Sequence, residues 1–250
     1  VYSILQRLNT EDSNIITVED PIEMNIEGIN QVQVNSDVGL SFATALRSIL
    51  RQDPDIIMIG EIRDDETAKI AVRASITGHL VLSTIHTNNS LNTIERLTDM
   101  NVERYLLGAA LSGVISQRLA RRLCKKCRVL RETNEYEKEL FKKNLGLDVN
   151  EIYDAQGCDE CHQGYKGRIA IQEVLLTNQE IKDAIVLNSP KKELRKLVYG
   201  KSGTTTLFQD GLLKVVSGET SLEEILKLVE SDDEVDTEIE EEAKEKDIEL

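Results

Sequence analysis

Short apolar runs alternate with amphipathic segments over the first half of the chain. The continuous runs 15–18 and 56–59 are typical of strands that are covered on both faces. The segments 40–52 and 64–78 have apolar residues at helical spacing, and the second starts with acids and stops at Gly78. Two more strands are predicted, an alternating one at 31–34 and a buried one at 79–86. This order predicts an α/β sandwich up to about residue 120.

Long helical patterns follow from residue 91 to residue 123, so we expect helices there. The longest nearly apolar run within this stretch, 105–115, is interrupted by Gly108, Ser112 and Gly113. Such a run is too short to span a bilayer. No secretory signal is visible, and the sequence starts with Val1. We therefore expect a soluble, cytosolic protein.

Charge is unevenly distributed along the chain. The 250 residues carry a formal net charge of −15, and their number suffices for one large domain or two modest ones. Residues 230–250 hold twelve acids and two lysines, a net of −10, which leaves −5 for residues 1–229. We expect this end to be a disordered acidic tail, with an acidic docking segment as the alternative. The overall balance argues against a nucleic-acid binder.

Polar side chains follow three of the predicted strands. Glu19 and Asp20 follow the first strand, Glu61 and Arg63 the strand at 56–59, and His86 the last. The carboxyl ends of parallel strands share one edge, where open α/β sheets bind ligands, so we expect these groups to converge. A carboxylate there can hold a magnesium-bound water or orient an attacking one, while arginine and histidine can meet phosphate charge. The alternative is core strands that end in a surface Glu–Arg pair and a structural histidine.

All four cysteines lie in two C-x-x-C pairs with thirty residues between the pairs. Two such pairs can supply four thiolates to one tetrahedral zinc, so we predict a structural zinc site. Four free thiols or two disulfides are the alternatives, and a cytosolic location disfavours disulfides. The intervening chain should be folded, with a helix at 134–146, and His162 is expected to be a bystander rather than a substitute ligand. The predicted zinc ligands are Cys124, Cys127, Cys158 and Cys161.

Several motifs, in order along the chain, resemble those of the secretion ATPases that drive type II secretion and type IV pilus assembly. "ITVEDPIE" is similar to their acidic box, "ALRSILRQDPDIIMIGEIRD" to the arginine-bearing helix and Walker B region, and "TGHLVLSTIHTNNS" to the histidine box. The likeness extends from Val1 to about Glu230. "CKKC" and "GCDECHQGYKGRIAIQEV" resemble the zinc subdomain of the assembly branch, which retraction ATPases usually lack. This favours assembly or export over retraction.

The resemblance implies an α/β fold with a RecA-like P-loop NTPase core. In this family a G-x-x-x-x-G-K-S/T loop opens a helix whose continuation is similar to "VYSILQRLNT". We therefore expect the chain to be a fragment that begins just after this loop and is inactive alone, since the loop's amides cradle the phosphates. The domains expected are a core at 1–122 without the loop, a tetracysteine zinc-binding subdomain at 123–168, a strand and helical region at 169–229, and the acidic tail at 230–250.

By resemblance, individual residues receive expected roles. Glu61 is the Walker B acid that acts on magnesium through water or polarises the attacking water, and Glu19 is the acidic-box group that assists it, beside Asp20 and Glu23. His86 is the histidine-box residue near the terminal phosphate. Where many P-loop motors have aspartate before the Walker B glutamate, this chain has Gly60, as the family commonly does. The expected nucleotide-binding residues are Arg47, Arg51, Arg63, Asp20 and, more weakly, His79.

The resemblance implies an ATP-hydrolysing hexameric motor that uses ATP, Mg²⁺ and Zn²⁺. Such a motor lies in the cytoplasm at the inner face of the cytoplasmic membrane, where it acts on an inner-membrane platform protein to assemble pilins or pseudopilins. The chain has no strongly basic face, so no nucleic-acid partner is expected. One alternative is a pilus-retraction or DNA-transfer ATPase of the same superfamily. The other is a non-catalytic, zinc-bearing interaction module.

Overall fold

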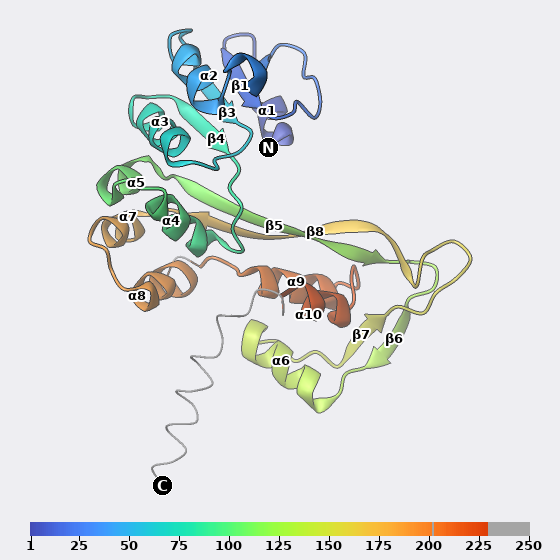
Figure 1. Cartoon of the computed structure of the whole chain (residues 1–250). Coiled ribbons are helices and arrows are strands. Elements are labelled where there is room, and N and C mark those ends of the chain that lie inside the picture. Colours follow the sequence, from blue (N-terminus) through green and yellow to red (C-terminus); the bar gives the residue numbers. More distant parts are fainter. Residues whose placement is uncertain (202, 230–250) are drawn as a thin grey trace. The chain divides into compact units, whose positions relative to one another are not determined.

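The computed structural model describes residues 1–201 and 203–229, so the predicted acidic tail at 230–250 lies outside the described residues (Figure 1). The chain divides into two compact units. The first unit contains Val1–Val114 and the segment that starts at Leu175, and the second contains Ile115–Val174 and the segment that starts at Gly203. Each unit has an apolar core of its own. No helix in the described ranges is long and apolar enough to cross a membrane.

The first unit is an α/β structure around a four-stranded sheet with the order β2-β1-β3-β4. All neighbouring strands in this sheet run parallel. The predicted α/β class with a parallel sheet is therefore confirmed. The elements of the unit are α1 (Tyr2–Leu8), β1 (Ile15–Glu19), β2 (Asn30–Gln33), η1 (Ser36–Val38), α2 (Phe42–Ile49), β3 (Ile56–Ile59), α3 (Asp65–Ile76), β4 (Leu80–Ser83), α4 (Ser90–Asp99), α5 (Arg104–Ala110), α7 (Gln179–Val186), α8 (Lys191–Arg195) and the π-helical turn η2 (Lys196–Lys201).

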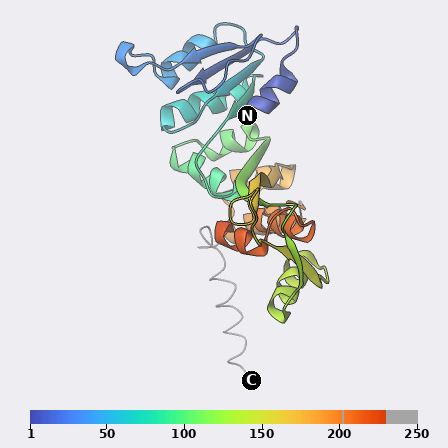
Figure 2. The same cartoon turned by 90° about the vertical axis from the view of Figure 1, so that its right-hand side faces the viewer.

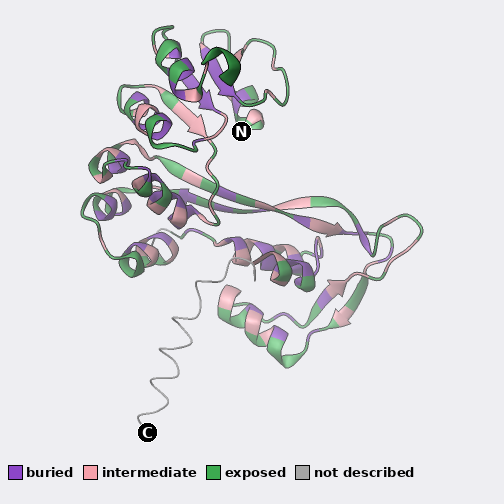
Figure 3. Ribbon diagram, viewed as in Figure 1, coloured by how far each residue is buried: buried purple, intermediate pink, exposed green. Residues whose placement is uncertain are grey.

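The two faces of this sheet belong to different apolar clusters. Ile57 and Ile59 of β3 pack with α2 and α3, whereas Ile56 and Met58 of the same strand pack with Leu5 of α1. Alternate residues of a strand point to opposite faces, so a strand covered on both sides must be apolar throughout. The views agree that α1 lies across the sheet from α3 (Figure 2). Burial colouring shows the same pattern, because β1 and β3 are buried along their length (Figure 3).

Local sequence sets the ends of the helices around the sheet. The side chain of Ser41 accepts a hydrogen bond from the Thr44 N–H and caps α2, and Asp64 caps α3 through the N–H of Thr67. Acidic residues in the first turn of α3 add a favourable interaction with the helix dipole. The chain then leaves α3 through Gly78, whose φ of +107° suits glycine best. These features match the start and stop predicted for the helix at 64–78.

The prediction of helices throughout 91–123 was wrong at its end. The segment forms α4 and α5, but Gly113–Leu123 is the strand β5, which pairs with β8 (Tyr165–Leu176). Ile115, Leu119 and Leu123 are spaced like one side of a helix, and the strand partner comes much later in the sequence, so periodicity alone was misleading. The strand predicted at 79–86 is also less buried than expected, because β4 is the last strand in the sheet order and is partly exposed.

The second unit surrounds a smaller core. It contains a two-stranded antiparallel ribbon, and the loops before and after this ribbon carry the cysteines. The helix predicted at 134–146 is present as Glu135–Leu145, with Gly146 as its C-cap. Phe141 and Ile152 are buried in its core together with Leu212 and Ile225. The chain enters this unit through β5 and leaves it through β8. The further elements of the unit are β6 (Val129–Glu132), α6 (Glu135–Leu145), β7 (Glu151–Asp154), α9 (Leu207–Val216) and α10 (Leu222–Val229).

Candidate functional site

The carboxyl ends of β1, β3 and β4 lie at one edge of the parallel sheet of the first unit. Val18 pairs with Ile59 and Ile59 with Ser83, so the three strands end at the same level. The residues that follow these strands therefore start from neighbouring positions. The predicted convergence of polar groups at this edge is confirmed for the residues after β3 and β4, which are in direct contact.

Glu61 is the centre of this contact. Its Oε1 lies 2.5 Å from Nη2 of Arg63, and its Oε2 lies 3.2 Å from Nε2 of His86. Only 12% of the Glu61 side chain is exposed, against 86% for His86. The hydrogen bond from Arg63 lowers the pKa of Glu61, against the opposing effect of burial, and His86 lowers it further. Glu61 is therefore a carboxylate at neutral pH, held between two groups that can also contact a phosphate.

Thr84, which the sequence analysis did not single out, fixes the position of Glu61. Its hydroxyl donates to the carbonyl of Gly60 at 2.6 Å, and its own carbonyl accepts from the N–H of Ile62 at 3.0 Å. Thr84 thus holds the residues on both sides of Glu61, while His86 follows two positions later. Side-chain bonds to backbone leave no periodic signal in a sequence, which explains the omission.

Gly60 lets the ends of β1 and β3 approach closely. Its N–H donates to the carbonyl of Val18 at 2.7 Å, and a Cβ at this position would lie 3.3 Å from Cα of Glu19. A larger residue would push the two strand ends apart. Glycine at position 60, where many P-loop motors have aspartate, is therefore explained by the close packing of the two strand ends.

Glu19 is placed differently from Glu61. It is only 3% exposed, and its carboxylate accepts hydrogen bonds from Tyr2, Thr17 and Gln31. Asp20, by contrast, is exposed, and its charge contributes to the raised pKa of Arg63, whose main cause is the hydrogen bond to Glu61. The acidic segment thus approaches the Glu61 site through Asp20, while Glu19 points into the protein.

The remaining predicted nucleotide-binding residues lie apart from this contact. Arg47 of α2 forms an ion pair with Glu66 in the first turn of α3, and Arg51 is exposed just beyond α2. His79 precedes β4, at the opposite edge of the sheet from His86, and its Nδ1 lies 3.0 Å from the carbonyl of Ala74. The structure therefore does not bring Arg47, Arg51 or His79 into contact with Glu61.

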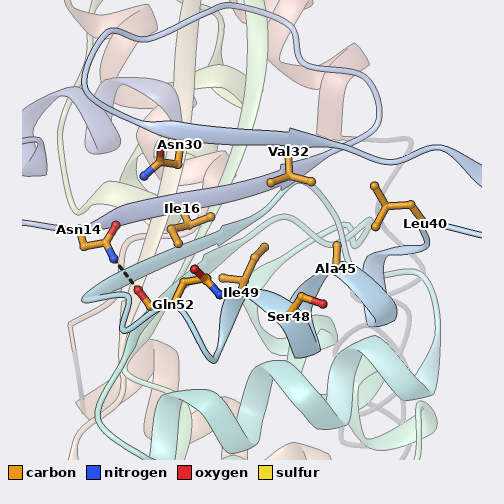
Figure 4. Close-up of a pocket in the computed structure, with 9 residues that line it drawn as sticks. All are labelled: Asn14, Ile16, Asn30, Val32, Leu40, Ala45, Ser48, Ile49 and Gln52. Carbon is orange, nitrogen blue, oxygen red and sulfur yellow. Dashed lines mark hydrogen bonds between the residues drawn. The ribbon is translucent and has the colours of Figure 1, made fainter.

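A cavity of about 460 Å³ lies elsewhere in the first unit, between β1, β2 and α2. Figure 4 shows apolar side chains and the amides of Asn14, Asn30 and Gln52 around it, with Asn14 hydrogen-bonded to the Gln52 carbonyl. None of the predicted site residues lines this cavity. The chemistry at the strand ends is therefore on an open edge rather than in the cavity.

The four cysteines form a compact cluster in the second unit, and their sulfur atoms all lie within 4.8 Å of one another. The Sγ atoms of Cys127 and Cys161 are 3.6 Å apart, and those of Cys124 and Cys158 are 4.0 Å apart. Four thiolates around zinc at about 2.3 Å would lie roughly 3.8 Å from one another, so this cluster fits such a metal. A disulfide would need about 2.05 Å, so the disulfide alternative is excluded.

The thiols of the cysteine cluster differ in their surroundings and therefore in their pKa. The N–H of Lys126 donates to the sulfur of Cys124, which is the main reason that the pKa of this thiol falls to about 7. Backbone N–H groups that point at sulfur stabilise thiolates in this way. The pKa of the Cys127 thiol is raised instead, to about 12, mainly because of burial. His162 is not part of the cluster, and its backbone pairs with Tyr165 instead. Within residues 1–201 and 203–229, the four cysteines are the group that could hold a metal ion.

Comparison with known proteins gives a consistent set of relatives. Residues 1–227 match the family model described as "Type II/IV secretion system protein". The chain is 49% identical over 229 residues to the putative type II secretion system protein E of Escherichia coli, a match that covers 91% of this chain and 46% of that protein. It is also 49% identical over 227 residues to the type IV pilus assembly ATPase PilB of Thermus thermophilus, covering 90% of this chain and 25% of that protein.

A solved structure extends the comparison to three dimensions. The crystal structure of the pilus retraction motor PilT with bound ADP matches with a TM-score of 0.66 and 31% identity, covering 91% of this chain and 56% of that one. The chain spans less than half the length of the two curated relatives described above.

Proposed function

Because this chain belongs to the type II/IV secretion system protein family, we propose that it is the ATP-hydrolysing part of a motor for pilin or pseudopilin assembly. The observation that supports this most directly is the contact of Glu61 with Arg63 and His86 at the carboxyl edge of a parallel sheet. Hydrolysis of ATP requires an oriented water and compensation of phosphate charge, and these three side chains can supply both.

Each residue of the site has a role in this proposal. Glu61, ionised at neutral pH, orients and polarises the attacking water, and the acidic segment of Glu19, Asp20 and Glu23 assists it. His86 donates a hydrogen bond to the terminal phosphate, and Arg63 balances the charge that develops there. Carboxylates and water are the ligands that Mg²⁺ prefers, so the acids of this edge fit that ion, which would neutralise phosphate charge when bound.

Arg47 and Arg51 do not contact Glu61, and in the proposal they act on the nucleotide of a neighbouring subunit. Both guanidinium groups are exposed on or just after α2, so they are open to phosphate of a nucleotide held in a neighbouring subunit. To bind this phosphate, Arg47 would have to leave its ion pair with Glu66. His79, bonded at the far edge of the sheet, is the weakest of the proposed nucleotide contacts.

The cysteine cluster is proposed to bind one structural zinc ion in a subdomain at residues 123–168. The close spacing of the four sulfur atoms supports this. A zinc site closed by four thiolates has no open position for catalysis, so its contribution is to the fold.

At the level of the whole protein, we propose a homohexamer that works in the cytoplasm at the inner face of the cytoplasmic membrane, on an inner-membrane platform protein. The relatives that are 49% identical are named for type II secretion and pilus assembly, whereas PilT, a retraction motor, is 31% identical. Together with the cysteine cluster, this favours assembly or export over retraction. A non-catalytic zinc-bearing module is disfavoured by the Glu61 contacts, which such a module does not need.

Glu61→Gln in the full-length protein tests the proposed activity. The substitution keeps the size of the side chain but removes the charge that polarises water. We expect nucleotide binding to persist and the rate of ATP hydrolysis to fall at least about 10²-fold. Glu139→Gln, at an exposed glutamate of α6, is the matched control and should hydrolyse ATP at the parent rate. Near-normal hydrolysis in Glu61→Gln, or none in the parent, would contradict the proposal.

A further inference from the structure

Glu19 is a buried carboxylate whose partners are all neutral. Its Oε1 accepts from the hydroxyl of Thr17 at 2.5 Å and from the amide of Gln31 at 3.0 Å. Its Oε2 accepts from the hydroxyl of Tyr2. A buried carboxylate needs such donors, and these use both of its oxygens. Glu19 therefore connects side chains from α1 and β2 at the end of β1.

Two of these partners also hold the loop that follows. We use "acidic loop" for residues 20–28, which contain three acids, Asp20, Glu23 and Glu27. The hydroxyl of Tyr2 accepts from the N–H of Glu23 at 3.1 Å. Gln31 donates to the carbonyl of Met24 at 3.1 Å and accepts from the N–H of Ile26 at 2.8 Å. Tyr2 and Gln31 therefore connect the buried Glu19 to three backbone positions of the acidic loop.

The start of the acidic loop lies next to the Glu61 site. Glu19 is packed against Gly60, the residue before Glu61, and the charge of Asp20 acts on Arg63. A change in the position of Glu19 would move Asp20 relative to the Glu61–Arg63 pair. The burial of the Tyr2 hydroxyl and its bond to Glu19 raise the pKa of Tyr2, so it remains a hydrogen-bond donor at any ordinary pH.

We propose that Tyr2 and Gln31 are positioning residues of the nucleotide site, which act through Glu19 to hold the acidic loop beside Glu61. The inference rests on the proposed ATPase function. In this arrangement Glu19 connects Tyr2 and Gln31, and the loop that they hold carries three exposed acids, Asp20, Glu23 and Glu27. The simpler alternative is that these bonds only stabilise the fold, in which case their loss would change stability but not the reaction.

Tyr2→Phe separates the two interpretations, with Tyr136→Phe, at a tyrosine that is 64% exposed, as the matched control. In the chain itself, amide hydrogen exchange of the Glu23 N–H should accelerate in Tyr2→Phe only, because its acceptor is gone, while the amides of Ile57 and Ile59 stay protected. In the full-length protein, kcat should fall about tenfold with KM for ATP within about twofold, because a displaced loop misplaces the reacting groups without removing binding contacts.

The outcomes are distinct. Unchanged exchange at Glu23, or faster exchange with an unchanged kcat, would overturn the inference. If Tyr2→Phe also reduces the amide protection of Ile57 and Ile59, the test is repeated with Gln31→Met, which leaves α1 unchanged. This variant must then lower kcat at constant KM. A parent protein that does not hydrolyse ATP would refute the proposed function instead, and the exchange at Glu23 would still decide whether Tyr2 holds the loop.

Discussion

At the scale of single residues, two glutamates at neighbouring strand ends have opposite environments. Glu61 contacts a guanidinium and an imidazole and lies at an open edge, whereas Glu19 is buried among neutral donors. A neighbouring cation stabilises the charged form of a carboxylate, as Arg63 does for Glu61, whereas the hydrogen-bond donors around Glu19 are neutral. The chemistry of the proposed site therefore depends on Glu61, and its geometry on the groups that hold the surrounding backbone.

Thr84 is the residue whose substitution tests this dependence on geometry. Thr84→Val removes the hydroxyl that holds Gly60 and keeps the shape of the side chain, so the segment with Glu61 should become less well positioned. A hydrogen bond contributes about 0.5–1.5 kcal/mol net, so we expect kcat for ATP to fall roughly threefold to tenfold. Thr84→Ser keeps the hydroxyl and should stay within about twofold of the parent. Equal kinetics of the two variants would show that the hydroxyl does not position Glu61.

The sequence predicted the chemical groups of the site but not their support. Glu61, Arg63 and His86 could be predicted to meet because residues after parallel strands share an edge. Tyr2, Gln31 and Thr84 could not, since they act through hydrogen bonds to single backbone atoms or to a buried carboxylate. Such bonds depend on how distant segments pack, which no local pattern records.

At the scale of elements, predictions succeeded where local sequence sets both the period and the ends. The helix α3 is an example, with its Asp64 cap and the exit at Gly78. The prediction of a helix at β5 was wrong because the partner of this strand, β8, is far away in the sequence. Pairing between distant segments overrides a helix-like spacing of apolar residues. The helix α6 succeeded for the same reason as α3, because Asn134 and Glu137 form a reciprocal capping box.

Glu137 gives α6 a pH-dependent contribution to stability. Its carboxylate accepts from both terminal nitrogens of Arg131 at 2.7 Å, and this pairing lowers its pKa below the ordinary 4.5. A lowered folded-state pKa stabilises the fold above pH 4.5, and the contribution is lost as the pH falls through the folded-state value. Glu137→Gln should therefore lower the free energy of unfolding by about 1–2 kcal/mol at pH 7, and by progressively less below pH 4.5.

Urea denaturation followed by the amide signals of α6, at neutral and acid pH, measures this difference. Glu135→Gln is the control on the same helix, because Glu135 is 87% exposed in its pair with Lys138 and exposed pairs contribute little. A deficit for Glu137→Gln that stays constant down to pH 3 would show that the charge of Glu137 is not what stabilises α6.

At the scale of the whole molecule, the two units have separate sources of stability. The first unit buries the apolar residues of a parallel sheet and its helices. The second has a smaller core and adds polar links, such as the contact of Arg121 in β5 with the buried Glu224 of α10. Small cores are commonly supplemented by a metal site, which is the part proposed for the cysteine cluster.

Removal of the metal should therefore affect the two units unequally. Zinc held by four thiolates contributes roughly 10–16 kcal/mol of apparent free energy in small domains, which equals or exceeds the stability of a typical domain. We expect about one zinc per chain by elemental analysis of reduced protein purified without chelator. Chelation, or Cys124→Ser, should abolish amide protection around the cysteine cluster and in β6 and β7. Protection of Ile57 and Ile59 in β3 should persist, because these residues are completely buried in the other core.

Re-addition of zinc should restore the lost protection in the chelated parent but only weakly in Cys124→Ser, which lacks one ligand. Ser48→Ala, in the first unit and outside both proposed sites, is the control for non-specific effects of substitution. Two results would contradict the structural zinc: well under one zinc per chain, or unchanged protection of β6 and β7 after chelation. Simultaneous loss of protection in β3 would contradict the separate stability of the two units. None of the four cysteines belongs to the sheet of the first unit, so loss of the metal should leave this sheet intact.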